Sequence, residues 1–148
     1  MLKRHTFWLR TSVVILMITA IVHSISLFVD PVAQNETERQ LIELMTTYRN
    51  DLGGFHPTMA DLMTALSSCF SLLCLLGGLT LWYVARQNVG HGILKGIVAI
   101  HIVVFGICFA MMSLFTFLPP IILTGLAFLS LVITSFTIPR ESAGTHPA

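Results

Sequence analysis

The segment ILKGIVAIHIVVFGICFAMMSLF, residues 93–115, decides the fold class, because it is apolar almost throughout and its one charged residue is Lys95. About 17 to 25 residues at a rise of ~1.5 Å cross the ~30 Å hydrocarbon layer of a bilayer, so this run is long enough for a transmembrane helix. Three further apolar runs of similar length occupy residues 11–29, 59–84 and 121–138. The sequence therefore predicts an all-α polytopic membrane protein with four transmembrane helices in an antiparallel bundle.

The composition agrees with these spans. The chain has 148 residues, of which 55% are hydrophobic and only 10% are charged, with a mean hydropathy of +0.84. An average soluble domain carries about 25% charged residues. Outside the spans only residues 30–57 form a segment of any size, so we expect one membrane domain over residues 1–148 and no soluble module. A net charge of +1 gives no reason to expect a nucleic acid as partner.

The basic residues predict the orientation. Six of the eight lie on one side of the expected spans: Lys3, Arg4, Arg10, Arg86, Lys95 and Arg140. The other two, Arg39 and Arg49, lie on the opposite side. Because cytoplasmic loops carry an excess of Lys and Arg, we expect both termini and the short connection at residues 86–91 to be cytoplasmic.

The first span has an alternative reading as a cleavable signal peptide. Basic residues precede its apolar stretch, and the small residues Ser24 and Ser26 follow near the expected cleavage position. Cleavage would leave three spans. However, the basic residues continue to Arg10 and the apolar stretch continues to Val29, so we favour a retained span.

The three cysteines, Cys69, Cys74 and Cys108, all fall within the expected spans. Cys69 and Cys74 are separated by about 140° around a helix axis, so they are not placed for a local disulfide. The chain has no Cys-x-x-Cys pair, which argues against a quinone-linked disulfide-forming enzyme of the four-helix type. We expect apolar, free thiols.

The outer segment predicts a helix of its own, over about residues 36–50. Asn35 and Glu38 form an N-terminal capping box. Apolar residues then recur at helical spacing: Leu41, Ile42, Leu44, Met45, Tyr48 and Leu52. The opposite face is polar, so this outer helix should be amphipathic and lie on the mouth of the bundle or in the membrane interface.

Ionisable residues inside spans are costly and often functional, which makes His23, Asp61, Lys95 and His101 the residues to examine. At 1.5 Å per residue, His23 and Asp61 lie roughly 10 Å and 6 Å below the outer boundary, so the two can meet. His101 lies roughly 14 Å from the inner boundary, near the midplane. We therefore regard His23, Asp61 and His101 as candidate binding residues.

Two interpretations of His23 and Asp61 compete. A pair would form a proton-accepting site open to the outer face, with the carboxylate orienting the imidazole. Alternatively, Asp61 forms a capping box with Thr58 at the start of the second span, which we favour. Lys95 is expected to reach the cytoplasmic headgroups. His101 has no such explanation.

No cofactor or metal is expected. His23 and His101 differ in depth, which argues against two axial ligands of one haem. The histidines of the loops and the tail, His56, His91 and His146, lack the spacing of a zinc site. Small residues within the spans, among them Gly77, Gly78 and the pair Gly92 and Gly96, are more typical of close helix packing: Gly92 and Gly96 match the small-xxx-small pattern.

Several short motifs follow one another along the chain: His23-Ser24 late in the first span, Asp30-Pro31, the outer helix, Gly53-Gly54-Phe55, Leu81-Trp82-Tyr83, and the turn Phe115-Thr116-Phe117-Leu118-Pro119-Pro120. In this order the chain resembles a family of small uncharacterised bacterial four-helix inner-membrane proteins. The stretch Ser67-Ser68-Cys69 departs from the more aromatic and glycine-rich pattern expected there. The resemblance implies a bacterial cytoplasmic membrane and a four-helix bundle, and it transfers no catalytic residue.

Two functions are compatible with these observations. The first is a structural or accessory membrane subunit that contacts a membrane-protein partner or further copies of itself. The second is a proton-linked small-molecule carrier with an outward-facing site near His23 and Asp61. We rank the subunit first, because no broken helix or inverted repeat is evident. We expect no enzyme, since no nucleophile elbow, metal motif or carboxylate pair accompanies the polar residues.

Overall fold

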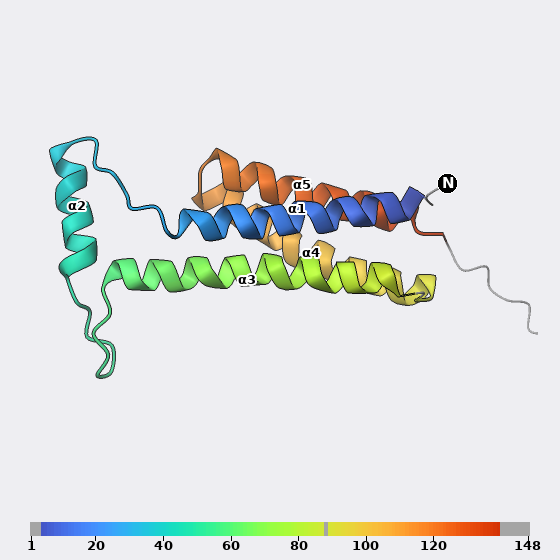
Figure 1. Cartoon of the computed structure of the whole chain (residues 1–148), viewed down its shortest axis with the longest axis horizontal. Coiled ribbons are helices and arrows are strands. Elements are labelled where there is room, and N and C mark those ends of the chain that lie inside the picture. The colour runs from blue at the N-terminus through green and yellow to red at the C-terminus, as the bar shows by residue number, and fades with distance from the viewer. Residues whose placement is uncertain (1–3, 88, 140–148) are drawn as a thin grey trace, which may run out of the picture. The chain divides into compact units, whose positions relative to one another are not determined.

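The structure is a computed structural model that describes residues 4–87 and 89–139, and in this part of the chain all regular secondary structure is helical. The helices are α1 (Arg4–Ser26), α2 (Glu36–Thr47), α3 (Met59–Arg86), α4 (His91–Phe115) and α5 (Leu118–Thr137) (Figure 1). By length and composition α1, α3, α4 and α5 are each able to cross a membrane. The predicted all-α class and four candidate spans are thus confirmed.

The first span starts and ends earlier than the predicted range of residues 11–29. Its helix begins at Arg4, because a transmembrane helix can continue past the hydrocarbon layer into water, where polar residues are tolerated. It ends at Ser26. The amides of residues 27, 28 and 29 each donate to a carbonyl three residues earlier, over 3.1 to 3.4 Å, and Asp30-Pro31 then disfavours helical backbone.

The other boundaries differ by a few residues. α2 ends at Thr47 instead of residue 50. Tyr48 caps it with an extended backbone, and its backbone amide donates a hydrogen bond to the Leu44 carbonyl. α5 begins at Leu118 instead of residue 121, so Pro119 and Pro120 lie in its first turn. Proline is tolerated there because the first amides of a helix have no partner within the helix.

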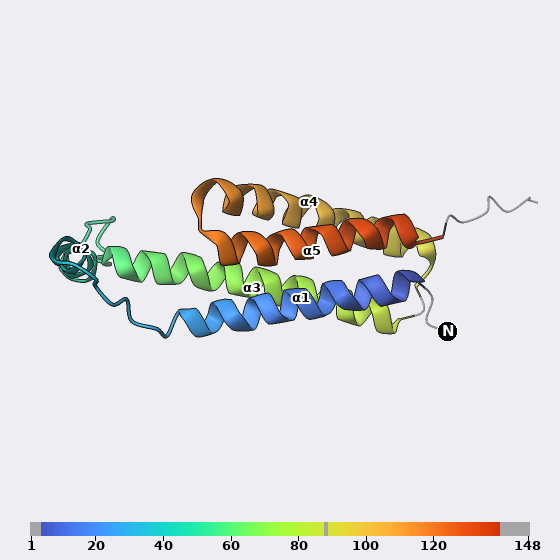
Figure 2. The same cartoon turned by 90° about the horizontal axis from the view of Figure 1, so that it is seen from above.

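The described residues divide into two compact units, residues 4–19 with 74–87 and 89–139, and residues 20–73. The first unit contains the start of α1, the end of α3 and all of α4 and α5. Within it α4 and α5 pack side by side as a helical hairpin joined by Thr116 and Phe117 (Figure 2).

Glycines allow the close packing of α4 against α5. A Cβ at Gly106 would lie 3.0 Å from Phe128 of α5, and a Cβ at Gly125 would lie 3.0 Å from Phe109 of α4. The rings of Phe109 and Phe128 are stacked, with centroids 6.1 Å apart. Each ring therefore rests on a glycine of the opposite helix, which brings the backbones together.

Contacts of a side chain with a glycine also join the other helices of this unit. A Cβ at Gly77 of α3 would lie 2.9 Å from the ring of Phe105 of α4, and one at Gly78 would lie 3.0 Å from the sulfur of Met17 of α1. The predicted packing role of Gly77 and Gly78 is confirmed. Gly96, in contrast, has open space where a Cβ would be, so it makes no close approach to another helix within the described residues.

A buried hydrogen bond also links two of these helices. The hydroxyl of Ser12 in α1 donates to the hydroxyl of Ser130 in α5 over 2.9 Å. In turn the Ser130 hydroxyl donates to its own helix, at the carbonyl of Ala127. Both serines are almost fully buried, so their polar groups are satisfied by one another and by the backbone.

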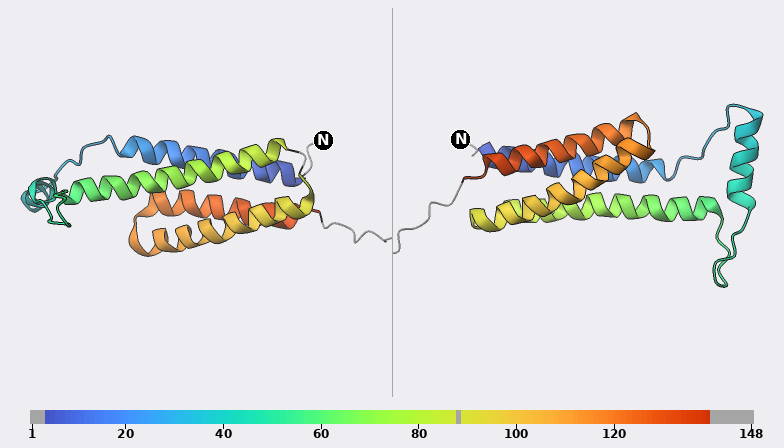
Figure 3. Two further views of the ribbon diagram at one scale, coloured as in Figure 1. Left: turned by 90° about the horizontal axis from the view of Figure 1, so that it is seen from below. Right: turned by 180° about the vertical axis from the view of Figure 1, so that it is seen from behind.

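The second unit contains the end of α1, α2 and the start of α3. Between α2 and α3 the chain makes a tight hairpin-like turn, closed by isolated bridges between Arg49 and Thr58 and between Leu52 and Phe55 (Figure 3). Gly53 and Gly54 at its tip have φ angles of 61° and 90°, the positive values that such two-residue turns require. The two glycines thus form the tip of this turn.

Candidate functional site

Asp61 belongs to a capping box at the start of α3. One carboxylate oxygen accepts hydrogen bonds from the amide and the hydroxyl of Thr58, at 2.9 and 2.8 Å, and the amide of Asp61 donates to the Thr58 hydroxyl at 3.1 Å. These bonds satisfy backbone donors that the helix itself leaves free. The sequence-based interpretation of Asp61 as a capping residue is confirmed.

His23 lies in the last turn of α1 beside Phe70 of α3. The two rings meet edge to face, with centroids 5.0 Å apart. The Nε2 atom of His23 is buried and has no hydrogen-bond partner within the described part of the chain. An unpaired buried polar atom is uncommon, and within the described residues this unit contains two of them, Nε2 of His23 and the hydroxyl of Ser71.

His101 lies in α4 and is bound to its own helix. Its Nδ1 atom is 2.8 Å from the carbonyl oxygen of Ile97, one turn earlier. Its ring stacks on that of Phe105, with centroids 6.3 Å apart. Phe105 in turn rests on Gly77 of α3.

His23 and Asp61 both belong to the unit of residues 20–73, but the described structure does not pair them. Across residues 4–87 and 89–139, no hydrogen bond or ion pair joins His23 to Asp61. His101 belongs to the other compact unit. In the same residues no group of three or more histidine, cysteine or acidic side chains is placed to hold a metal ion. Cys69, Cys74 and Cys108 are free thiols.

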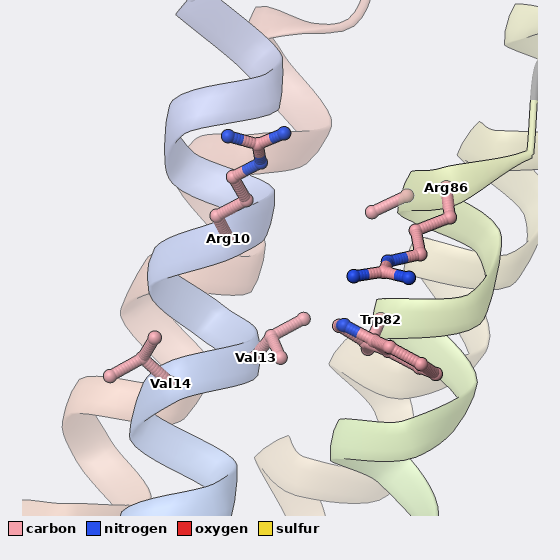
Figure 4. A pocket seen from close by; sticks show the side chains of 6 residues that line it. Arg10, Val13, Val14, Trp82 and Arg86 are labelled. Carbon is pink, nitrogen blue, oxygen red and sulfur yellow. The ribbon is translucent and has the colours of Figure 1, made fainter.

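A groove between the start of α1 and the end of α3 was not predicted. It has a volume of about 400 Å³ and is lined by Arg10, Val13, Val14, Trp82, Ala85 and Arg86. Figure 4 shows the Arg86 side chain lying over Trp82 and pointing toward α1, with Val13 pointing toward Trp82. The Arg86 guanidinium is 4.4 Å from the centroid of the indole ring, a cation–π distance.

A second hollow of about 330 Å³ lies nearby in the same unit and includes His5, Gln87 and His91 among its lining residues. The rings of His5 and His91 meet edge to face, with centroids 5.7 Å apart. His91 is the first residue of α4, whereas the sequence indicated a loop position. The spacing of these residues along the chain gives no signal of their contact.

α2 exposes an apolar face. None of its residues is buried, and Leu41, Leu44 and Tyr48 are between 54% and 61% exposed. Its capping residue is the predicted one, since the Asn35 side chain accepts from the amide of Glu38 at 2.9 Å.

The charged face of α2 is internally paired. Arg39 donates to both carboxylate oxygens of Glu36, at 2.9 and 2.6 Å, and its guanidinium is 3.8 Å from Glu43. Hydrogen bonds from Arg39 first, and from Gln40 second, lower the pKa of Glu36 below its ordinary value. The charged side chains of the polar face are thus paired with one another, whereas the apolar side chains of the opposite face are exposed.

No protein-family model, no curated protein and no solved structure matches this chain.

Proposed function

We propose that this protein is a structural or accessory subunit of a bacterial cytoplasmic membrane, and that α2 docks on a membrane-protein partner. The observation that carries the proposal is the exposed apolar face of α2. A short helix with its polar face internally paired and its apolar face uncovered presents a surface of the kind that binds a groove on another protein.

The proposed arrangement places this face outside the cytoplasm. Arg4, Arg10, Arg86 and Lys95 lie at the ends of the spans opposite to the segment that contains α2. The positive-inside rule then makes the amino terminus, the α3–α4 connection and the carboxyl terminus cytoplasmic. In this arrangement α1, α3, α4 and α5 cross the membrane in alternating directions as an antiparallel bundle.

Affinity capture of the tagged full-length protein in mild detergent, with mass spectrometry of what co-purifies, tests the docking face. The variant is Leu41→Ser with Leu44→Ser, on the apolar face, and the matched control is Gln40→Ser on the polar face of the same helix. We expect a stoichiometric protein partner with the unmodified chain and the control, and at least about a tenfold loss with the variant.

The docking variant should keep the thermal stability of the unmodified chain to within about 0.5 kcal/mol, because no side chain of α2 is buried. Partner binding that is equal in the variant and the control would refute the docking face. A chain that purifies without any stoichiometric protein would refute the subunit function.

A proton-linked carrier is the second candidate, and it is favoured by the buried, unpartnered Nε2 of His23. This function predicts proton flux into liposomes that contain the purified protein. The flux is measured with an entrapped pH-sensitive dye under an imposed pH gradient. The flux would be lost in His23→Ala and, if the carboxylate takes part, in Asp61→Asn. Flux no greater than in protein-free liposomes would leave the subunit as the function.

A further inference from the structure

The groove of Arg10, Val13, Trp82 and Arg86 combines positive charge with an apolar wall. One arginine from each helix lines it, and Figure 4 shows Arg86 over Trp82 and Val13 pointing toward Trp82 from α1. Both helices contribute from the same compact unit. A ligand that fits this surface has an anionic group and an apolar body.

Within residues 4–87 and 89–139, neither Arg10 nor Arg86 forms an ion pair with a carboxylate. All the acidic residues that the structure describes belong to the other unit: Asp30, Glu36, Glu38, Glu43, Asp51 and Asp61. Over residues 4–87 and 89–139 the ion pairs involve Arg39 alone among the arginines. The positive charge of the groove is therefore available to a ligand.

The position of the groove at the ends of two spans narrows the class of ligand. Arg86 is the last residue of α3, and Arg10 lies within the first two turns of α1. Trp82 lies one turn before the helix end, at the depth where tryptophan is enriched in membrane proteins. Span ends of this kind lie at the level of the lipid phosphates, so acyl chains can extend along Val13 and Trp82 while the headgroup meets the arginines.

From this geometry we infer that the groove binds an anionic phospholipid through its phosphodiester, with Arg10 and Arg86 as the phosphate-binding residues. Guanidinium groups match phosphate oxygens in fork geometry, and the stacking of Arg86 on Trp82 holds one fork in place. A lipid with a cationic headgroup fits less well, because none of the described residues that line the groove is acidic and able to receive an ammonium group. A lipid phosphate is preferred to free phosphate because a lipid also contacts the apolar lining of the groove with its acyl chains, which an inorganic ion does not.

Trp82 provides a built-in reporter for the test. The chain has two tryptophans, so the Trp8→Phe variant leaves Trp82 as the only one. The full-length variant is reconstituted in phosphatidylcholine vesicles that contain a small fraction of phosphatidylglycerol with brominated acyl chains. Because bromine quenches tryptophan only at short range, a bound lipid quenches Trp82 more than random mixing does.

We expect phosphatidylglycerol to quench Trp82 at a lower mole fraction than brominated phosphatidylcholine does. Arg10→Gln with Arg86→Gln should weaken the relative affinity for phosphatidylglycerol by roughly tenfold or more, because each basic residue near an anionic surface contributes about 1 kcal/mol. Lys95→Gln removes one charge from the same end of the spans outside the groove and is the matched control. Arg86→Lys keeps the charge and loses the fork, so an intermediate affinity is expected.

Helix content by circular dichroism, measured on every variant, establishes that each one is folded before its quenching is interpreted. Equal quenching by the two lipids would overturn the inference, as would an affinity in the double variant that equals that of Lys95→Gln. Displacement of brominated phosphatidylglycerol by millimolar inorganic phosphate would overturn the lipid assignment in favour of a free anion.

Discussion

At four glycines of the first unit, a side chain of a neighbouring helix rests on the backbone: Gly77, Gly78, Gly106 and Gly125. The contact at Gly77 is the tightest of them, since both Cε2 and Cζ of Phe105 lie 2.9 Å from the position of an added Cβ. Phe105 is only 1% exposed, so its ring has little room to withdraw. Side-chain volume at Gly77 is therefore a sensitive test of the packing.

We predict that Gly77→Ala lowers the free energy of unfolding by about 1–3 kcal/mol, the usual cost of overpacking a core. Gly96→Ala is the matched control on a helix surface with open space, and it should be neutral or slightly stabilising, because alanine favours helix over glycine. Thermal melting of the purified protein in detergent measures both. Equal melting of Gly77→Ala and the unmodified chain would contradict the packing described here.

The Asp61 side chain provides a second prediction for a single residue. Asp61→Ala should destabilise the start of α3 by about 0.5–2 kcal/mol, as the loss of a cap does, and Thr58→Ala should act in the same way. Because the two residues share their hydrogen bonds, the double variant should cost less than the sum of the two single variants. Asp51→Ala, in the exposed loop, serves as the control.

Hydrogen exchange of the amides in the first turn of α3 measures this local stability. Additive effects of Asp61→Ala and Thr58→Ala would show that the two residues act independently and would contradict the capping box.

The sequence predicts some of these residue roles well and others poorly. The box of Thr58 and Asp61 is readable because its geometry is local and depends on a fixed spacing of three residues. The contacts of Phe128 with Gly106 and of Phe109 with Gly125 are not, because they depend on how two helices align. The groove of Arg10 and Arg86 was not predicted for the same reason. A tryptophan one helical turn before an arginine at the end of a span, Trp82 before Arg86, was nevertheless a usable signal.

At the scale of the helices, hydropathy predicts where the spans lie but not where they end. Residues 93–115 and the observed α4, His91–Phe115, nearly coincide, whereas α1 starts seven residues before the predicted residue 11. Hydropathy identifies the residues that suit the hydrocarbon layer. The helix itself ends where a cap, a turn or a proline ends it. The hairpin-like turn at Gly53 and Gly54 was likewise missed, because its bridges join residues across the turn.

The stability of α2 should depend on pH through Glu36. Hydrogen bonds from Arg39 and Gln40 lower the pKa of Glu36 in the folded helix below its ordinary value of 4.5. The corresponding stabilisation is therefore fully present above that value, and it is lost as the pH falls through the lower folded pKa. We predict that α2 loses helix content in this acidic range.

Backbone chemical shifts of residues 36–47 in detergent micelles, followed from neutral pH into the acidic range, measure the helix content of α2. The variant Glu36→Gln should flatten the part of the response that Glu36 causes, and the response of α4 serves as an internal reference. An acid-induced loss that is unchanged in Glu36→Gln would contradict this assignment.

At the scale of the whole molecule, four apolar helices are long enough to cross a membrane, and the uneven distribution of basic residues supports the proposed orientation. The proposed docking of α2 depends on this orientation, because the proposal places α2 outside the cytoplasm and the groove of Arg10 and Arg86 on the cytoplasmic side. The orientation is accordingly the central claim.

Site-directed cysteine labelling in intact cells tests the orientation most directly. In a background where Cys69, Cys74 and Cys108 are replaced by alanine, Gln40→Cys lies in α2 and Gln87→Cys lies just after α3. We predict that a membrane-impermeant maleimide labels Gln40→Cys in intact cells and labels Gln87→Cys only after the cytoplasmic membrane is opened. Labelling of Gln87→Cys in intact cells, with Gln40→Cys protected, would contradict the orientation and with it the proposed docking face.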